Sequence, residues 1–234
     1  MGDFCEGLLM ESPPNYESYD YSRDWHRKKL NDLAEKAIIR SWIKPARTCL
    51  ELGTGFGRIT KILQSQFDDI VSLDFSRRNL ATASKSIPHS VASFIRADIR
   101  NLPCESDLFD FIIMIRVAHH LSDPSIVLNE ICRVAKNRAT VIISLPNPLL
   151  SEARKHNRSV HIYTGESGHK IYSTPFSAYS HDRFFLLERR GTGIFENRIA
   201  EKFEFLPYLH LADVATSQFW FLKKTLFLRF EIRK

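Results

Sequence analysis

LELGTGFG, residues 50–57, joins a short apolar run to a segment whose apolar residues have helical spacing. A strand that turns sharply into a helix needs glycine where φ is positive or where a ligand touches the backbone. The first turn of such a helix offers unpaired N–H groups to that ligand. We therefore expect a strand, a binding turn and a helix here, as at the ligand crevice of open α/β sheets.

Apolar runs and helical patterns alternate from this stretch to residue 147. The apolar runs predict strands over residues 47–52, 69–74, 91–97, 110–117 and 139–145. Apolar residues at helical spacing predict helices over residues 24–43, 58–67, 76–86 and from Asp123 onward. Strands and helices that alternate in this way favour an α/β fold with a doubly wound, mostly parallel sheet and helices on both faces.

The last third of the chain has weaker patterns. Residues 149–181 are polar and lack periodicity, so we expect an insertion over the carboxyl edge of the sheet. A helix is expected over residues 182–190, and strands over 194–205 and 227–232. The chain then divides into an N-terminal arm and helix at 1–44, a cofactor-binding core at 45–148, a lid at 149–181, and the last part of the sheet with a substrate wall at 182–234.

Length and composition fit one α/β domain with an added lid. The chain has 234 residues, of which 44% are apolar. No uncharged apolar run reaches the roughly 18 residues of a membrane span, and the acidic N-terminus differs from a secretory signal. We therefore expect a cytoplasmic protein with no transmembrane segment. The cysteines form no CxxC pair, and Cys49 and Cys132 lie in apolar segments, which predicts core residues and no metal site.

Positive charge is concentrated in the last third of the chain. The formal net charge is +6. Residues 151–234 hold 14 Lys and Arg against 9 Asp and Glu, which gives +5, and residues 1–150 contribute the remaining +1. A basic surface attracts phosphate groups or an anionic membrane, although dispersed, solvated charge is the commoner meaning of such a count.

Three acidic residues stand at the ends of successive predicted strands. Glu51 lies two residues before Gly53, and the glycines follow a GxGxG spacing instead of the GxGxxG of dinucleotide-binding turns. A carboxylate there would repel a pyrophosphate but would attract the ammonium and sulfonium groups of S-adenosylmethionine (SAM). Asp74 closes the second strand, where a carboxylate can accept both ribose hydroxyls, and Asp98 closes the third, facing the adenine amino group. Together they predict a site for a positively charged nucleoside.

In this order, the motifs resemble those of the class I SAM-dependent methyltransferases. The likeness covers residues 45–147 and rests on CLELGTGFGR, SLDFS, ADIRNLP, FDFIIMIRVAHHLSDP and EICRVAKNRATVIISLPN. It implies a Rossmann-like, seven-stranded sheet with SAM as the cofactor. By this resemblance, the methionine part of SAM would lie at Gly53, Thr54 and Gly55, with Glu51 beneath them and a backbone contact from Arg116. The ribose would bind Asp74. The adenine would lie against Phe75, and its edge would contact Asp98 and the Ile99 amide. One departure is KNRA at 136–139, where the family commonly has Lys-Pro-Gly-Gly.

A histidine pair, His119 and His120, follows the fourth predicted strand at the mouth of the crevice. A histidine there has a pKa suited to accept a phenol or enol proton, and we choose His120 as the catalytic candidate. The competing interpretation is a histidine that caps the turn or packs on the cofactor. Three further histidines in the insertion are candidates to face the substrate, namely His161, His169 and His181.

Two aromatic segments have open roles. Three tyrosines on the N-terminal arm either close over the cofactor or anchor the arm, namely Tyr16, Tyr19 and Tyr21. Residues 203–227 are dense in aromatic side chains. They either form the core face of a helix and of the last strand, or they line an apolar pocket or lie at a membrane surface with Lys223 and Lys224 at headgroup level.

Three functions stay open at the level of the sequence. The first is a methyltransferase for a small-molecule or lipid-like acceptor, because VAHHL and the PN after the fifth strand are most similar to the branch with quinone-biosynthesis methyltransferases. The second is a tRNA or other nucleic-acid methyltransferase, which the basic last third motivates. The third is a non-catalytic SAM-binding partner subunit, which intact motifs in every cofactor position disfavour. The oligomeric state is not predicted.

Overall fold

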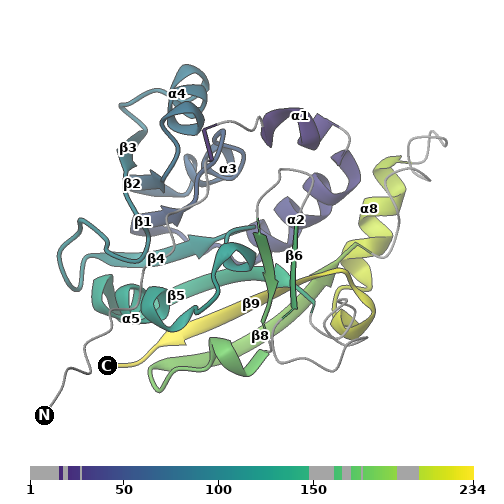
Figure 1. The fold of residues 1–234 in the computed structure, drawn as a ribbon. Helices are drawn as coiled ribbons and strands as arrows, with labels where there is room; N and C mark the ends of the chain where they lie inside the picture. The colour runs from purple at the N-terminus through teal and green to yellow at the C-terminus, as the bar shows by residue number, and fades with distance from the viewer. Residues whose placement is uncertain are drawn as a thin grey trace, which may run out of the picture.

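A seven-stranded sheet forms the centre of the part of the chain that the structure describes. The computed structural model describes residues 16–17, 21–26, 28–147, 161–164, 170–174, 176–193 and 206–234. The strand order in this sheet is β3-β2-β1-β4-β5-β9-β8 (Figure 1). The strands are β1 Ala46–Leu52, β2 Phe67–Asp74, β3 Ala92–Arg96, β4 Phe109–Met114, β5 Ala135–Pro146, β8 Phe184–Thr192 and β9 Thr225–Ile232.

Strand direction defines the edge at which a ligand is expected. The strands β1 to β5 pair in parallel, and β9 pairs antiparallel with both β5 and β8. The expected mostly parallel sheet of seven strands is therefore confirmed. We call the edge at which β1 to β5 end the carboxyl edge. β9 begins at this edge, because Thr225 pairs with Pro146, the last residue of β5.

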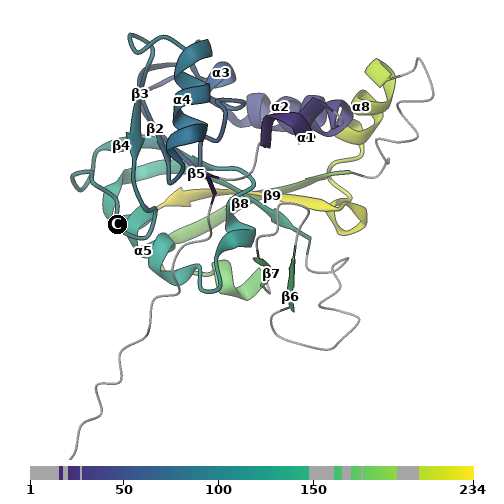
Figure 2. The same cartoon turned by 45° about the horizontal axis from the view of Figure 1, so that its top comes forward.

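Helices cover both faces of the sheet, as a doubly wound fold requires. Figure 2 shows α2, α3, α4 and α8 on one face and α5 on the other. A short α1 precedes α2, and α8 contacts both α2 and β8. The helices are α1 Tyr21–His26, α2 Lys29–Trp42, α3 Thr60–Leu63, α4 Arg77–Ser86, α5 Ser125–Val134 and α8 Leu206–Ala215.

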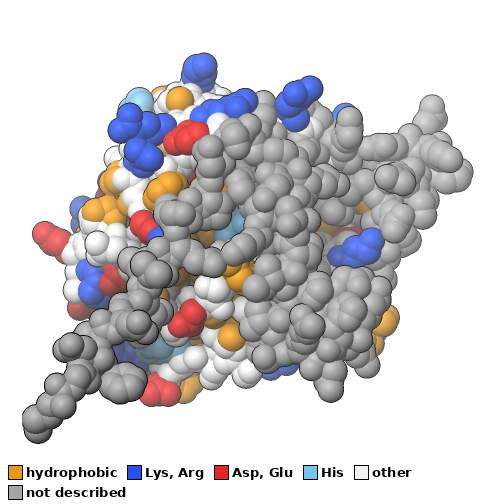
Figure 3. Space-filling view, viewed as in Figure 1, with side chains coloured by type: hydrophobic (Ala, Val, Ile, Leu, Met, Phe, Trp, Pro, Cys, Tyr) orange, Lys and Arg blue, Asp and Glu red, His pale blue; other side chains and the backbone are white. Residues whose placement is uncertain are grey.

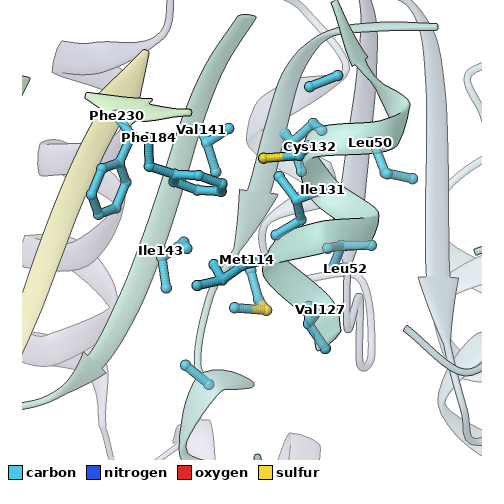
Figure 4. Close-up of a cluster of buried hydrophobic side chains, with 14 of the residues drawn as sticks. Leu50, Leu52, Met114, Val127, Ile131, Cys132, Val141, Ile143, Phe184 and Phe230 are labelled. Carbon is cyan, nitrogen blue, oxygen red and sulfur yellow. The ribbon is translucent and has the colours of Figure 1, made fainter. Parts of the chain in front are cut away.

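The core on the α5 side comes from the apolar stripe that the sequence predicts. Asp123 Oδ1 accepts a hydrogen bond from the Ser125 amide at 2.8 Å, which fixes the start of the helix. Apolar residues then recur at helical spacing and pack on the sheet beside Leu52 and Met114 (Figure 4). The predicted stripe is buried at every position: Val127, Leu128, Ile131, Val134 and Ala135.

The prediction of a helix over residues 182–190 is wrong, because this segment forms β8. Phe184 to Thr192 pair with β9 over almost their whole length, and the register shifts once, between Leu186 and Glu188. A pairing partner distant in the sequence supplied these hydrogen bonds, so tertiary contact overrode local helix propensity. The predicted strand at 227–232 is confirmed as β9, while the one at 194–205 lies outside the described residues.

The segment expected to be irregular contains ordered pieces. A two-stranded antiparallel sheet joins β6 His161–Thr164 to β7 Lys170–Ser173, and a 3-10 turn, η2, spans Phe176–Tyr179. The strand β7 contacts η1, the turn Ala118–His120 that follows β4, and the Tyr179 hydroxyl donates to the Ala118 carbonyl at 3.3 Å. These contacts place the described part of the insertion beside the carboxyl edge, and its role as a lid stays a prediction.

Two helices are shorter than the sequence pattern predicts. The pattern over residues 24–43 divides into α1 and α2, and Lys28 between them has non-helical dihedral angles. In the short α1, the Trp25 ring lies over the Arg58 guanidinium, with 3.7 Å between the guanidinium carbon and the ring centroid. Instead of continuing to residue 67, α3 ends at Leu63, because β2 already begins at Phe67.

The structure tests the expectations on the cysteines and on membrane-spanning segments. Cys49 is fully buried and Cys132 nearly so, as expected for small core residues; Cys104 is half-buried, and Cys5 lies outside the described residues. Among the helices of the described ranges, none combines the length and the apolar character that crossing a bilayer requires.

Candidate cofactor site

The glycine turn after β1 has the backbone geometry that its sequence predicts. Gly53, Gly55 and Gly57 have φ angles of +77°, +56° and +84°, a region that L side chains rarely adopt. The amides of Gly53 and Thr54 both donate to the Leu73 carbonyl, at 2.8 and 2.9 Å. The turn is therefore held against the end of β2, at the carboxyl edge.

The three glycines differ in what surrounds them. A Cβ on Gly53 would lie 2.2 Å from Val117 Cγ2, and one on Gly57 would lie 2.7 Å from Ile87 Cδ1. A Cβ on Gly55 would meet nothing within 4 Å. Gly53 and Gly57 are thus needed for packing, whereas Gly55 faces open space in which a ligand can approach the backbone.

Glu51 lies beneath this turn and is almost completely buried. Its Oε2 atom accepts hydrogen bonds from the hydroxyls of Thr54, Thr60 and Ser72 at 3.0, 2.6 and 2.9 Å. Burial raises the pKa of the Glu51 carboxyl from 4.5 to about 7, although the three hydroxyls oppose the shift. Near neutral pH the group is therefore balanced between its neutral and its ionised form.

The Glu51 equilibrium predicts a pH-dependent affinity for a cationic ligand. A cation bound beside the carboxyl favours its ionised form, so binding releases a proton wherever the free protein is still protonated. The affinity for SAM is expected to rise by up to about tenfold between roughly pH 6 and 8 and then level off. Calorimetric titrations at several pH values measure this rise. The variant Glu51→Gln should show a flat profile, and an unchanged slope would exclude Glu51 as its source.

Asp74 connects the glycine turn to the start of α4. Its Oδ2 atom accepts from the Gly55 amide at 2.7 Å, and its Oδ1 atom accepts from the Ser76 amide at 2.8 Å. Burial raises the pKa of the Asp74 carboxyl, while these backbone hydrogen bonds and one from Asn79 oppose the rise. The side chain therefore lies directly beside the open face of Gly55, where the sequence places the ribose.

Asp98 follows β3, two strands from the glycine turn, whereas Phe75 follows the neighbouring strand β2, and each of them contacts an arginine. Arg100 holds the Asp98 carboxylate through Nε at 3.0 Å and through Nη2 at 2.6 Å. Burial alone would raise the pKa of Asp98, but the Arg100 hydrogen bonds bring it below its ordinary value. The Arg96 guanidinium carbon lies 5.4 Å from the centre of the half-buried Phe75 ring. An ionised Asp98 is therefore available only as an acceptor, as an adenine amino group requires.

Arg116 is the site residue with the most constrained backbone. Its φ is +61°, which is unusual for a residue other than glycine. The Arg116 amide donates to Ser144 Oγ at 2.8 Å, and its guanidinium pairs with Glu35 of α2, with 2.9 Å between Nε and Oε1. Arg58 Nη2 donates to the other Glu35 oxygen at 2.8 Å. Fully buried Glu35 thereby joins the residues after β4 to the residue after the glycine turn.

The sequence pattern did not identify Glu35 and Arg58 as part of the site. The available signal was an acid within the apolar stripe of a helix, because Glu35 follows Ala34 and precedes Ile38 on the buried side of α2. Such an acid needs a buried partner. The pattern does not show which basic residues supply it.

The histidine pair lies in η1, at the end of β4. The ring centroids of His119 and His120 are 4.2 Å apart. Burial lowers the pKa of His119 well below its ordinary value, and the neighbouring His120, Arg116 and Lys28 lower it further. His119 is therefore neutral at pH 7. The catalytic role of His120 stays a prediction.

The N-terminal arm reaches the site at Tyr16 and Glu17. The Tyr16 ring makes edge contacts with Phe75 and His120, at centroid distances of 6.3 and 5.4 Å. Glu17 accepts from the amides of Arg77 and Arg78 at 2.8 and 3.0 Å, so it caps the start of α4. These backbone hydrogen bonds lower the pKa of Glu17. Of the three arm tyrosines, Tyr16 thus spans the ends of β2 and β4; Tyr19 and the side chain of Tyr21 lie outside the described residues.

Removing the Tyr16 ring is expected to weaken cofactor binding modestly. The variant Tyr16→Ala loses two aromatic contacts across the crevice, each of a kind that contributes about 0.5–1.5 kcal/mol. Because these contacts join parts of the protein, only part of their energy acts on cofactor binding, and we expect the SAM dissociation constant to rise by up to about tenfold, with little change in the melting temperature. Tyr16→Phe serves as the control that keeps the ring. Equal loss in both variants would assign the effect to the hydroxyl and not to the ring.

One of the histidines expected to face the substrate, His181, contacts α5. His181 Nε2 lies 3.1 Å from Asn129 Oδ1, and His181 Nδ1 lies 3.5 Å from Cys132 Sγ. Both partners belong to α5, Asn129 at its middle and Cys132 near its carboxyl-terminal end. His181 therefore packs on that helix and does not face the glycine turn. Whether His181 faces the substrate stays a prediction, and the side chains of His161 and His169 lie outside the described residues.

Charge on the viewed face is not spread evenly. In Figure 3, blue side chains gather along the upper edge, over α4 and its surroundings. Exposed basic residues of this region are Lys61, Arg77, Arg78, Lys85 and Arg96. The basic character is thus not confined to the last third of the chain that the sequence count singled out.

A known family matches the central part of the chain. Residues 50–143 match the family described as "Methyltransferase domain". This range begins in β1 and ends in β5, and it contains all of the predicted cofactor residues. The match therefore covers the part of the chain that forms the glycine turn and the carboxyl edge.

Two curated relatives and one solved structure are similar to the chain. It is 34% identical to a demethylmenaquinone methyltransferase of Chlamydia pneumoniae over 87 residues, which is 36% of this chain and 38% of that protein. It is 29% identical to a 2-phytyl-1,4-naphtoquinone methyltransferase of Trichormus variabilis over 133 residues, 53% of this chain and 58% of that protein. The matches thus span from just over a third to somewhat more than half of these relatives.

The fold also matches a solved structure over most of its length. An S-adenosylmethionine-dependent methyltransferase from Mesorhizobium loti superposes with a TM-score of 0.63 at 16% identity, and the match covers 86% of this chain and 99% of that one. At this identity the likeness concerns the fold. The chain therefore shares the fold of that methyltransferase, and residues 50–143 match the methyltransferase-domain family.

Proposed function

We propose that the protein transfers a methyl group from SAM to a small, apolar acceptor of the quinone or phenol type. One observation carries the cofactor part of this proposal: an acidic carboxyl edge built around a glycine turn whose central glycine, Gly55, faces open space. The family match and the quinone-methyltransferase relatives support the reaction class.

The described residues fit SAM better than they fit a dinucleotide. Gly55 leaves room for a ligand against the backbone, and Asp74 borders that space through its hydrogen bond to the Gly55 amide. The buried Glu51 beneath the turn would repel a pyrophosphate and gains stability beside a cation. Arg116 and Arg58, which share Glu35, provide positive charge nearby for a ligand carboxylate.

Each residue then has a binding or positioning role in the proposed reaction. When bound, SAM supplies a methyl group on a positively charged sulfur, which is a good leaving group. Asp74 would accept hydrogen bonds from the ribose, and Asp98 from the adenine amino group. Tyr16 would cover the site between Phe75 and His120 and limit the entry of water. Catalysis would thus depend mainly on holding two reactants in line.

His120 would take up the proton that a hydroxyl-bearing acceptor loses. It lies at the end of β4, in contact with Tyr16 at the mouth of the crevice. The neighbouring His119 is held neutral by burial, so it does not place a second positive charge against a protonated His120. A kcat that falls with little change in KM in His120→Gln is the expected sign of this role.

Turnover with labelled SAM tests the proposal. The purified protein is incubated with methyl-labelled SAM and, separately, with a lipid extract, an aqueous metabolite extract and total RNA. We expect label in the organic phase of the lipid reaction, and much less label from Asp74→Ala when the SAM concentration is kept below the dissociation constant of that variant. Label that appears in RNA instead would replace the apolar acceptor by a nucleic acid, and binding of SAM without transfer to any fraction would indicate a non-catalytic protein.

A further inference from the structure

An exposed apolar tip separates α8 from β9. We define the apolar tip as residues 219–222, Phe-Trp-Phe-Leu, which include the 3-10 turn η3, Trp220–Leu222. Phe219, Phe221 and Leu222 are 46%, 47% and 54% exposed. Contiguous apolar side chains of this size are rarely left in water on a soluble protein without a binding role.

Hydrogen bonds hold the backbone of the apolar tip in place. The Asn147 side-chain amide donates to the carbonyls of Trp220 and Lys223, both at 2.9 Å. The Asn147 backbone amide donates to the Lys224 carbonyl, also at 2.9 Å. Because its backbone is already fixed in this way, the apolar tip would lose little conformational entropy when its side chains bind a partner.

Lys223 anchors the tip from inside, which corrects one sequence expectation. Its side chain is fully buried, and Nζ donates to Asp213 Oδ1 at 2.7 Å and to Thr216 Oγ1 at 2.8 Å. Lys223 therefore cannot lie at headgroup level. Lys224 is the exposed member of the pair, and the Arg189 guanidinium carbon lies 5.4 Å from the centre of the Trp220 ring.

The apolar tip lies at the same edge of the sheet as the glycine turn. Asn147 directly follows the end of β5, and Thr225, three residues beyond Leu222, pairs with Pro146. Figure 1 shows this end of β9, in yellow, beside the end of β5. The carboxyl edge thus contains both the proposed cofactor site and the apolar tip, separated by β4 and β5.

We propose that the apolar tip inserts into the interfacial layer of an anionic lipid bilayer. Exposed aromatic side chains fixed on a rigid turn match the apolar part of that layer. The exposed basic residues Lys224 and Arg189 at its border match anionic headgroups. The inference rests on the proposed function for its purpose, which is to bring the carboxyl edge to a membrane that holds an apolar acceptor.

Sedimentation with lipid vesicles tests this proposal. The probes are phosphatidylcholine vesicles with and without phosphatidylglycerol, and the full chain is used. Wild-type protein is expected to sediment with the anionic vesicles, and the triple variant Phe219→Ser, Phe221→Ser, Leu222→Ser to lose at least about tenfold in binding. Lys224→Gln should lose about fivefold on anionic vesicles only.

A matched control uses three exposed apolar residues away from the tip. Leu33→Ser, Ile126→Ser and Leu187→Ser change side chains that are 38%, 41% and 48% exposed, on α2, α5 and β8. This control should bind vesicles like the wild type. The inference is overturned if the wild-type protein binds neither kind of vesicle, or if the control variant loses as much vesicle binding as the tip variant. It is also overturned if the wild type is a dimer in solution and the tip variant is a monomer.

A SAM titration of the same variants separates the two proposals. All of them should bind SAM with unchanged affinity, because none of the substituted residues contacts the glycine turn. Vesicle binding that fails while SAM binding persists removes only the membrane inference. If the wild type does not bind SAM, the proposed function is wrong, but the conclusion on vesicle binding is unaffected.

Discussion

Replacing Gly53 by alanine is expected to lower the free energy of unfolding by about 2–6 kcal/mol. The new Cβ would lie 2.2 Å from Val117 Cγ2, and Gly53 has a φ of +77°, where L residues are strained. Strain of the backbone contributes about 1–3 kcal/mol and overpacking a similar amount. Urea unfolding followed by circular dichroism measures the difference. A loss below about 1 kcal/mol would contradict the close packing of the turn against the residue after β4.

Gly55→Ala is the matched control for this variant. Gly55 also has a positive φ, but a Cβ there meets nothing within 4 Å. Its unfolding free energy should fall by only about 1–2 kcal/mol. Its SAM affinity should nevertheless fall about tenfold or more, because the methyl group enters the space assigned to the ligand. Gly55→Ala with normal SAM binding would place the cofactor away from the open face of the turn.

Replacing Asp74 by alanine is expected to raise the SAM dissociation constant by roughly 10- to 100-fold, or about 1–3 kcal/mol. The variant loses the predicted hydrogen bonds to the ribose and also frees the amides of Gly55 and Ser76, which the carboxylate now holds at 2.7 and 2.8 Å. The turn and the start of α4 would then be less well fixed. Calorimetric titration with SAM measures the effect.

Asp69→Ala on the same strand controls for the loss of an acid from β2. The Asp69 side chain is 63% exposed and its contact with Arg47 is 3.6 Å long, so its removal should leave SAM binding unchanged. Unaltered affinity in Asp74→Ala would remove Asp74 from the cofactor site. Equal losses in both variants would indicate a general electrostatic effect of the strand.

The glycine turn and its acids were predictable because local chemistry and topology agree there. Positive φ at Gly53 and Gly55 follows from a strand that turns directly into a helix, and the ends of neighbouring parallel strands meet by the rules of the fold. The position of Asp74 at the end of β2, next to the end of β1, follows from the parallel pairing of these two strands. The same is true of the buried stripe of α5.

Residues whose partners are distant in the sequence were not predictable. Glu35 pairs with Arg58 and Arg116, which are 23 and 81 positions away. The segment of β8 reads as a helix by itself, and its hydrogen-bond partner β9 lies beyond α8. One of the two interpretations of residues 203–227 places Lys223 at a membrane surface, although Asp213 supplies a buried partner. In each case a tertiary contact reverses the local preference.

The most direct test of the account is a calorimetric titration of the purified chain with SAM and, in parallel, with NAD. The acidic carboxyl edge predicts saturable binding of one SAM per chain, with affinity that rises through neutral pH, and no binding of NAD. Binding of NAD in place of SAM would show that the carboxylates at the ends of β1, β2 and β3 do not form a site for a cationic nucleoside, and would contradict the assignment.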